Sequence, residues 1–310
     1  MAPTAGILRD EGDRRMSLVI RRRRRLDEVL HARAADIARR RSTGAPSVSV
    51  VIAALNEAEN LPFLLPKMDG HVDEIILVDG ASQDGTSEVA KRLDPRVRVV
   101  PQLGPGKGAA LRTGFAEASG DIIVTMDADC SMDPTEIPAY VGVLQAGADY
   151  VKGSRFLHGA GTTDMPFHRR LGNGAFVLLV RIFFGGKYTD LCYGYNAFWR
   201  EVLPRMNLDG DGFEIETVMN IRALRARLRV VEIGSVESER MYGDAKLRTF
   251  YDGWRVLRTI FRERFTRRAN ASAVPRPQVR KEPPVQVRNQ SGGVTADAMA
   301  FPGEVQSPQD

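Results

Sequence analysis

Residues 121–129 read Asp-Ile-Ile-Val-Thr-Met-Asp-Ala-Asp, a β-branched apolar run that leads directly into two carboxylates. The run predicts a buried strand, and three similar runs precede it in the chain. Helical stretches separate these runs, which makes a βαβ series. Such a series predicts an α/β fold with a mainly parallel sheet flanked by helices, whose ligands bind beyond the carboxyl ends of the strands. We expect the strands at 48–52, 74–78, 97–100 and 121–126, and the helices at 59–67, 86–93 and 108–118.

Polar side chains follow these strands at the points where they end. Asn56 and Glu57 come after the first strand, Asp79 after the second, and Asp127 and Asp129 after the fourth. Turn chemistry alone explains any single one of them. Because the carboxyl ends of parallel strands meet at one edge of a sheet, the convergence of several polar residues there predicts a ligand site.

Asp127 and Asp129 form the sharpest pair, since one residue separates them. From a shared turn, both carboxylates can approach one divalent cation, or one cation and a ribose. Their mutual repulsion needs a counter-charge, and Mg²⁺ or Mn²⁺ with oxygen ligands, bridging to diphosphate oxygens, is the natural one. The sequence offers no cluster of His and Cys for zinc.

A glycine-rich string, Gly-Pro-Gly-Lys-Gly at 104–108, opens the helix before that strand. Glycines allow close approach of a phosphate to the backbone, and Lys107 adds a positive charge at a helix N-terminus. The string is not a Walker A loop, because Ala109 follows Gly108, and no Gly-x-Gly-x-x-Gly turn follows the first strand. ATPase and dinucleotide-oxidoreductase functions are therefore disfavoured, and a simple turn is the alternative for the string.

The composition is ordinary for a globular protein: 310 residues, 43% of them hydrophobic and 27% charged. It excludes collagen, a coiled coil and a wholly disordered chain. No apolar run approaches the roughly 20 residues that span a bilayer, and the basic run at 21–25 is not followed by the apolar stretch of a signal peptide. The two cysteines, Cys130 and Cys192, lack metal-site spacing. We expect a cytoplasmic protein.

The net charge of +5 lies in one part of the chain. Residues 1–46 carry 12 Arg against 6 acidic residues, whereas 47–268 has a net charge of −1 and 269–310 is neutral. We predict a basic, largely flexible arm over 1–46, a single folded domain over 47–268, and a disordered Pro-rich tail over 269–310. The arm favours loose attraction to polyanions such as anionic lipid headgroups over specific nucleic-acid binding. A solvated arm without a partner is the alternative.

Four strings follow one another between residues 50 and 129. They are Val-Val-Ile-Ala-Ala-Leu-Asn-Glu at 50–57, Ile-Leu-Val-Asp-Gly-Ala-Ser-Gln-Asp-Gly-Thr at 76–86, Gly-Lys-Gly-Ala-Ala at 106–110 and Asp-Ala-Asp at 127–129. In this order they resemble the nucleotide-sugar-binding half of family 2 glycosyltransferases, so the resemblance implies a GT-A, Rossmann-like domain. It also implies a nucleoside pocket and a diphosphate and metal site. By this resemblance, the pocket would be lined by Leu55, Asn56, Glu57 and Asp79, and the diphosphate would face Lys107 and Arg112. Asp127 would touch the ribose or the metal, and Asp129 would hold the metal.

The second half of the chain is similar to the dolichyl-phosphate mannose synthase branch of this family. Its matching strings are Asp-Leu-Cys-Tyr-Gly-Tyr-Asn-Ala-Phe at 190–198, Phe-Glu-Ile-Glu at 213–216 and Arg-Met-Tyr-Gly-Asp-Ala-Lys-Leu at 240–247. The resemblance implies a single catalytic domain that transfers a hexose, with inversion, from a UDP- or GDP-linked donor. The base and the sugar of the donor stay open. So does a metal-ligating role for Ser131, which stands where many relatives have Gln.

Such a transfer requires that the leaving diphosphate be neutralised. A metal on Asp129 would supply positive charge together with Lys107, Arg240 and Lys246. The acceptor decides what else is needed, and two kinds of acceptor make different demands.

A sugar hydroxyl requires a general base, for which Asp190 and Glu216 are the candidates. A polyprenyl phosphate is already anionic near neutral pH, so it needs only orientation by cations, for which Arg155, Arg169 and Arg170 are the candidates. We favour a polyprenyl phosphate taken at the cytoplasmic face of the membrane. A small soluble acceptor and a non-catalytic polyanion-binding protein on the same fold are the alternatives.

A nearly continuous apolar stretch lies at 171–187, interrupted by Arg181. It predicts either an interfacial helix that rests on an anionic membrane or a helix packed against the sheet or in a dimer interface. The first reading makes the protein peripheral at the inner face of the cell membrane. The sequence leaves the oligomeric state open.

Overall fold

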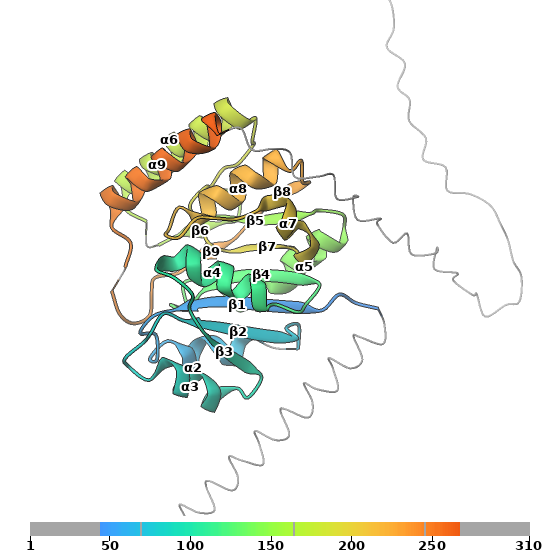
Figure 1. Cartoon of the computed structure of the whole chain (residues 1–310), viewed down its shortest axis with the longest axis vertical. Coiled ribbons are helices and arrows are strands. Elements are labelled where there is room, and N and C mark those ends of the chain that lie inside the picture. The colour runs from blue at the N-terminus through green and yellow to red at the C-terminus, as the bar shows by residue number, and fades with distance from the viewer. Residues whose placement is uncertain (1–43, 69, 164, 245, 267–310) are drawn as a thin grey trace, which may run out of the picture. The chain divides into compact units, whose positions relative to one another are not determined.

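The computed structural model describes residues 44–68, 70–163, 165–244 and 246–266. Its main sheet has seven strands in the order β3-β2-β1-β4-β7-β5-β8 (Figure 1). The strands are β1 Val48–Ala54, β2 Glu74–Asp79, β3 Val97–Pro101, β4 Ile122–Asp127, β5 Tyr150–Ser154, β7 Asn196–Trp199 and β8 Val230–Gly234. A second sheet pairs β6, Gly161–Thr162, with β9, Val236–Glu237.

Most neighbouring strands of the main sheet run parallel. β1 lies between β2 and β4, and its Val51 is opposite Ile76 of β2 and Thr125 of β4. β7 is the exception, because it runs antiparallel to both β4 and β5. The predicted mainly parallel sheet is therefore confirmed, and the four predicted strands correspond to β1–β4.

Helices cover both faces of this sheet (Figure 1). The α-helices are α2 Leu61–Leu64, α3 Thr86–Leu93, α4 Gly106–Glu117, α5 Ile137–Gln145, α6 Phe167–Phe184, α7 Leu203–Met206, α8 Ile215–Arg225 and α9 Thr249–Phe265. Three 3₁₀ turns join them, η1 Leu65–Lys67, η2 Pro134–Glu136 and η3 Arg200–Val202. Side chains of α2, α3 and α5 pack on one face, and those of α4 and α8 pack on the other.

The central strands are apolar on both faces because both faces are covered. In β1, Val50 and Ile52 point into the core beneath α2 and α5, whereas Val51 points into the core beneath α4 and α8. Because helices bury both faces of these strands, polar groups can contact a ligand only at the strand ends. The sheet therefore positions the site at the carboxyl ends of β1, β2 and β4.

Helices α6 and α9 lie side by side and form a third apolar cluster with α8 (Figure 1). Only Asn173 and Val180 of α6 are buried, while Leu171, Leu178 and Ile182 are exposed. The apolar stretch therefore packs on one side and presents apolar side chains on the other, which combines features of both predicted alternatives. In the described ranges, no helix is long and apolar enough to cross a membrane.

The predicted basic arm, 1–46, falls outside the described residues except for its last three positions, and the predicted tail, 269–310, falls wholly outside them. The boundaries proposed for the domain between them remain predictions.

Candidate active site

A cavity of about 1190 Å³ opens at the carboxyl ends of the parallel strands. Asp79 at the end of β2, Asp127 at the end of β4 and Asp129 just after it contribute to its wall. Lys107 of α4 and Glu216 of α8 line the same space. The fold thus brings together side chains that are far apart in the sequence, as parallel strand ends do in an open α/β sheet.

Lys107 joins two carboxylates at the centre of the cavity. Its Nζ lies 2.6 Å from Oδ1 of Asp127 and 2.8 Å from Oε1 of Glu216. Burial by itself lowers the pKa of Lys107, but the two carboxylates outweigh it and hold the pKa above its ordinary value, so the ammonium stays charged. Burial raises the pKa of Glu216 against the effect of Lys107. One N–H of the ammonium remains for a ligand.

Asp129 is held on both of its oxygens. Oδ1 accepts hydrogen bonds from the backbone N and the hydroxyl of Ser131, at 3.1 and 2.7 Å, and Oδ2 pairs with Arg240 at 2.7 Å. Glu57 pairs with Arg240 at 3.3 Å and with Lys246 at 2.9 Å, and Lys246 also donates to the carbonyl of Leu55. Ser131, whose role the sequence left open, here donates to the aspartate that follows β4.

Asp127 and Asp129, the two carboxylates predicted to approach a divalent cation, both line the cavity at this edge. Among the residues that the structure describes, no group of three or more His, Cys, Asp and Glu is arranged to hold a metal. A cation that takes one or two carboxylates and completes its shell with water and diphosphate oxygens needs no larger group. The donor set therefore fits Mg²⁺ or Mn²⁺ bound together with a diphosphate.

Arg112, which is predicted to face the diphosphate, lies outside the cavity lining. Its guanidinium pairs with Asp211 at 2.6 Å and donates to the carbonyl of Gly210. The spacing from Lys107 to Arg112 along α4 turns the two side chains to different sides of the helix. Arg112 therefore holds the segment before α8 against α4.

The glycines at the start of α4 allow the backbone of residues 210–211 to lie close against the helix. A Cβ on Gly106 would lie 2.4 Å from the carbonyl oxygen of Asp211, and one on Gly108 would lie 2.3 Å from that of Gly210. The N–H groups of Gly108 and Ala109 donate to the carbonyl of Asp211, at 2.7 and 3.2 Å. A neighbouring backbone therefore takes up the N–H groups of Gly108 and Ala109, which the sequence predicts to approach a phosphate.

We expect Gly108→Ala to lower the free energy of unfolding by about 2–3 kcal/mol, because the new methyl group collides with backbone that cannot move aside. Gly142→Ala is the matched control, since Gly142 lies within α5 and a Cβ there meets nothing within 4 Å. The control should gain about 0.5–1 kcal/mol from reduced backbone freedom in the unfolded chain. Urea titration of both variants tests this account, and equal stabilities would refute it.

Asn56 also lies outside the cavity lining, contrary to its predicted place in the nucleoside pocket. It has a positive φ of 54°, its N–H donates to Ser82, and its side-chain oxygen accepts from the N–H of Gln83. Asn56 therefore connects the loop after β1 to the loop after β2. Asp79 does line the cavity and accepts from Ser82 and Ser87. Burial raises the pKa of Asp79, but these hydrogen bonds outweigh it and lower the pKa overall.

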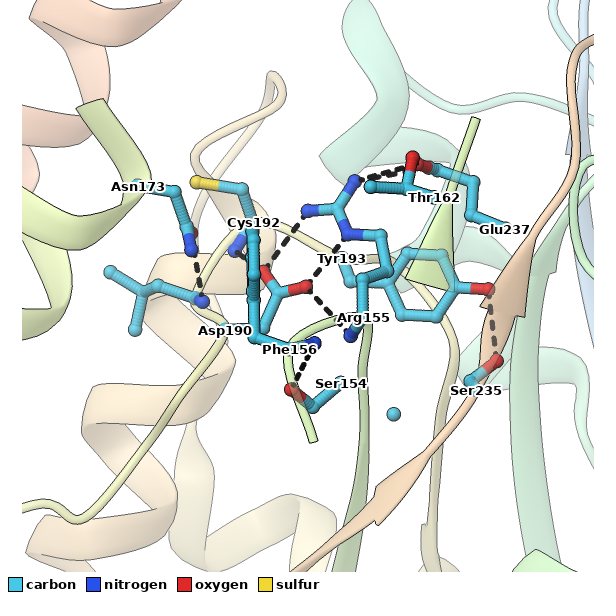
Figure 2. Close-up of polar contacts among 12 residues, drawn as sticks. Ser154, Arg155, Phe156, Thr162, Asn173, Asp190, Cys192, Tyr193, Ser235 and Glu237 are labelled. Atoms are coloured by element: carbon cyan, nitrogen blue, oxygen red, sulfur yellow. Dashed lines mark hydrogen bonds and ion pairs between the residues drawn. The ribbon is translucent and has the colours of Figure 1, made fainter. Parts of the chain in front are cut away.

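Arg155 lies between two carboxylates, as Figure 2 shows. Its Nε and Nη2 donate to Asp190 at 2.7 and 3.0 Å, and its Nη1 donates to Glu237 at 3.0 Å. The guanidinium also lies 4.8 Å from the centre of the Tyr193 ring. Arg155 reaches the cavity wall, but its donors are directed at protein carboxylates.

Asp190 is a poor general base in this arrangement. It is fully buried and does not line the cavity. Burial raises its pKa, but Arg155 outweighs the burial and keeps the pKa below its usual value. The structure therefore places the carboxylate of Asp190, a predicted candidate base, against Arg155 and not at the cavity.

Lys152 is a buried cation that sequence reasoning missed, although a lysine within an apolar strand is a visible signal. It is fully buried in β5 and donates to the carbonyls of Tyr193 at 2.5 Å and Gly153 at 3.0 Å. Burial lowers its pKa to about 8. It ties β5 to the chain that leads into β7.

We expect the free energy of unfolding to rise between pH 8 and pH 10.5, because there Lys152 is neutral in the folded protein and protonated in the unfolded chain. The contribution of Lys152 amounts to up to about 3 kcal/mol, as each pKa unit is worth about 1.4 kcal/mol. Urea titrations give the free energy of unfolding of the wild type and of Lys152→Met at each pH in this window. The change with pH in the difference between the two values is the contribution of Lys152. A difference that stays constant with pH would contradict the prediction.

The cavity continues from the strand ends to the α6 and α9 helices. His168, Arg169 and Phe176 of α6 line this part, as do Trp254 and Leu257 of α9. Arg169 donates through Nε to the hydroxyl of Thr249 at 3.1 Å. One continuous space therefore has a charged end near β4 and a more apolar end between two helices.

Comparison with known proteins identifies the family of this chain. The model of the family described as "Glycosyl transferase family 2" matches residues 49–206. The chain belongs to this family. The family confirms the resemblance found in the sequence.

Two curated relatives of this glycosyltransferase act on lipid phosphates by name. The dolichol-phosphate mannosyltransferase of Pyrococcus furiosus is 34% identical over 227 residues, which are 69% of this chain and 63% of that protein. The undecaprenyl-phosphate mannosyltransferase of Micrococcus luteus is 34% identical over 214 residues, 64% of this chain and 87% of that protein. The match thus spans a little under two thirds of the Pyrococcus protein.

The solved structures confirm the GT-A-like fold. Glucosyl-3-phosphoglycerate synthase from Mycobacterium tuberculosis, in complex with Mn²⁺, UDP-glucose and phosphoglyceric acid, superposes with a TM-score of 0.59 at 25% identity. The superposition covers 73% of this chain and 82% of that one.

Proposed function

We propose that this glycosyltransferase moves a hexose, with inversion, from a UDP- or GDP-linked donor to a polyprenyl phosphate. The observation that carries the proposal is the continuity of the cavity, which joins a charged end at β4 to an apolar end between α6 and α9. A nucleotide-sugar suits the first end, and a phosphate with an isoprenoid tail suits the second. The names of the two mannosyltransferase relatives support this choice of acceptor.

At the donor end, Asp129 and Asp127 would hold Mg²⁺ or Mn²⁺, as the ions in the solved relatives suggest. The bound metal supplies positive charge to the leaving diphosphate. Lys107 offers its remaining N–H to the same group, and Arg240 and Lys246 line the cavity with charges of the required sign. Leu55, Glu57 and Asp79 line the space left for the nucleoside.

At the acceptor end, a phosphate monoester is mostly anionic near neutral pH and needs no base to become a nucleophile. Arg169 and His168 would orient it from α6. Arg155 acts as a positioning residue here, because Asp190 and Glu237 already take its donors. Glu216 becomes relevant as a base only if the acceptor is a hydroxyl, and Lys107 then holds it in place.

We propose that the exposed faces of α6 and α9 lie on the anionic inner face of the cell membrane. Large apolar side chains are exposed along both helices, among them Leu178 and Ile182 of α6 and Trp254 and Phe265 of α9. Exposed arginines accompany them at Arg181, Arg258, Arg262 and Arg264. Apolar insertion combined with basic contacts is the usual pairing for reversible attachment to a membrane. The basic arm at 1–46, ahead of the proposed catalytic domain at 47–268, would add attraction.

The test is transfer of labelled glucose or mannose from the matching UDP- or GDP-linked donor to undecaprenyl phosphate in anionic vesicles, with label counted in the organic extract. Leu178→Glu should reduce this transfer strongly, because it places a charge on the membrane face. Leu103→Glu, on a more exposed leucine in the loop between β3 and α4, should not.

A soluble phosphorylated acceptor is the second candidate, favoured by the phosphoglyceric acid in the solved relative. Label found only in a water-soluble product, and unaffected by Leu178→Glu, would replace the lipid acceptor with that one. Absence of turnover together with absence of nucleotide binding would reject the enzyme altogether and leave the polyanion-binding alternative.

A further inference from the structure

The segment formed by residues 238–244 and 246 lies against the loops that follow β1 and β4. The N–H of Ser238 donates to the carbonyl of Ser131 at 3.0 Å, and the N–H of Met241 donates to the carbonyl of Asp129 at 3.3 Å. On the other side, the side-chain amide of Asn60 bonds both backbone groups of Tyr242, at 3.1 and 3.2 Å. The segment therefore connects the loop that carries Asp129 to the start of α2.

Two cations of this segment satisfy two acids of the site. Arg240 reaches Asp129 at 2.7 Å and Glu57 at 3.3 Å, and Lys246 reaches Glu57 at 2.9 Å. Both carboxylates are mostly buried, with side-chain exposures of 11% and 7%. Two negative and two positive charges make this group neutral as it stands. A neighbouring cation is the usual way to offset the desolvation of a carboxylate at such depth.

This arrangement puts Arg240 in competition with a metal. Oδ1 of Asp129 accepts two hydrogen bonds from Ser131, and Oδ2 pairs with Arg240, so a divalent cation that approaches Oδ2 meets the positive charge of the guanidinium there. Adding a metal alone would also place two more positive charges next to a neutral group. A diphosphate changes both conditions, because it carries negative charge and offers oxygens that a guanidinium binds well.

We propose that Arg240 is the resident counter-ion of Asp129 in the ligand-free protein, and that it exchanges Asp129 for the diphosphate when a metal binds. Metal and nucleotide then bind cooperatively, since each removes the obstacle to the other. The inference rests on the proposed function and adds a positioning role for Arg240. Backbone contacts at Ser238, Met241 and Tyr242 allow the segment to stay docked while the Arg240 side chain changes partner.

The test measures Mn²⁺ binding directly, by the electron paramagnetic resonance signal of free Mn²⁺, with no sugar and no acceptor present. For the wild type we expect Mn²⁺ alone to bind about tenfold more weakly than in the presence of saturating UDP or GDP, within the roughly 5- to 150-fold range usual for coupled sites. Arg240→Met should bind Mn²⁺ alone about tenfold more tightly than the wild type and lose most of the coupling. Arg240→Lys, which keeps the charge, should remain close to the wild type.

Arg181→Met on α6 is the distant control, because it removes an exposed arginine that lies outside the cavity lining. Thermal unfolding of each variant shows that it is folded before binding is measured. The inference fails if Arg240→Met binds Mn²⁺ alone no better than the wild type, or if Arg240→Lys gains as much as Arg240→Met. A wild type that binds neither nucleotide nor Mn²⁺ in any combination would instead overturn the proposed function.

Discussion

Asp129→Asn should lower the rate of sugar transfer by about a hundredfold or more, the scale expected when charge stabilisation at a leaving group is lost. The substitution keeps the size of the side chain and its hydrogen bond from Ser131, but it removes the charge that attracts a divalent cation. The measurement is the initial rate of UDP or GDP release at saturating donor, with Mg²⁺ or Mn²⁺ titrated. Excess metal should recover only part of the rate.

A matched control lies four residues further along the same loop. Asp133 caps the short η2 turn by accepting from the N–H of Thr135, and it does not line the cavity. Asp133→Asn keeps a capping oxygen and should leave the rate within about twofold, because asparagine caps nearly as well as aspartate. If Asp129→Asn retained the wild-type rate, the metal site at the end of β4 would be excluded.

The fold was predictable because its signals are local. The run at 121–129 and its three counterparts identify buried strands by composition alone, and the intervening helices then fix a parallel arrangement. Asp79, Asp127 and Asp129 follow those strands directly, so their convergence at the cavity needed no knowledge of distant contacts.

The partners of these residues were harder to predict because they come from distant parts of the chain. Lys107 was expected at a phosphate, and its observed contact with Glu216 depends on how α8 packs against α4. Gly108 was attributed to a ligand, yet the backbone at Gly210 requires it. A glycine in a sequence indicates close approach without showing what approaches. Similarly, Asp190 is a good candidate base in sequence, and only the fold shows Arg155 against it.

The buried ion pair of Arg155 yields the largest expected effect on stability. Arg155→Met should lower the free energy of unfolding by about 3–5 kcal/mol, because it leaves the fully buried carboxylate of Asp190 without its cation. Glu237 loses a partner too, but it keeps a hydrogen bond from Thr162 and is partly exposed. Urea titration at pH 7 measures the change.

The double variant Arg155→Met with Asp190→Asn separates a buried charge from lost packing. It removes the unpaired charge while keeping an oxygen for the N–H of Cys192, so at least half of the lost stability should return.

Arg98→Met is the control: it removes an exposed arginine that pairs with Glu117, and it should lower the free energy of unfolding by no more than about 1 kcal/mol. Suppose that Arg155→Met instead lowered the free energy of unfolding as little as Arg98→Met and raised the KM for the acceptor. Arg155 would then be a residue that binds the acceptor phosphate directly. A large loss of stability that the double variant partly recovers would establish Arg155 as the residue that holds the acceptor side of the cavity in shape.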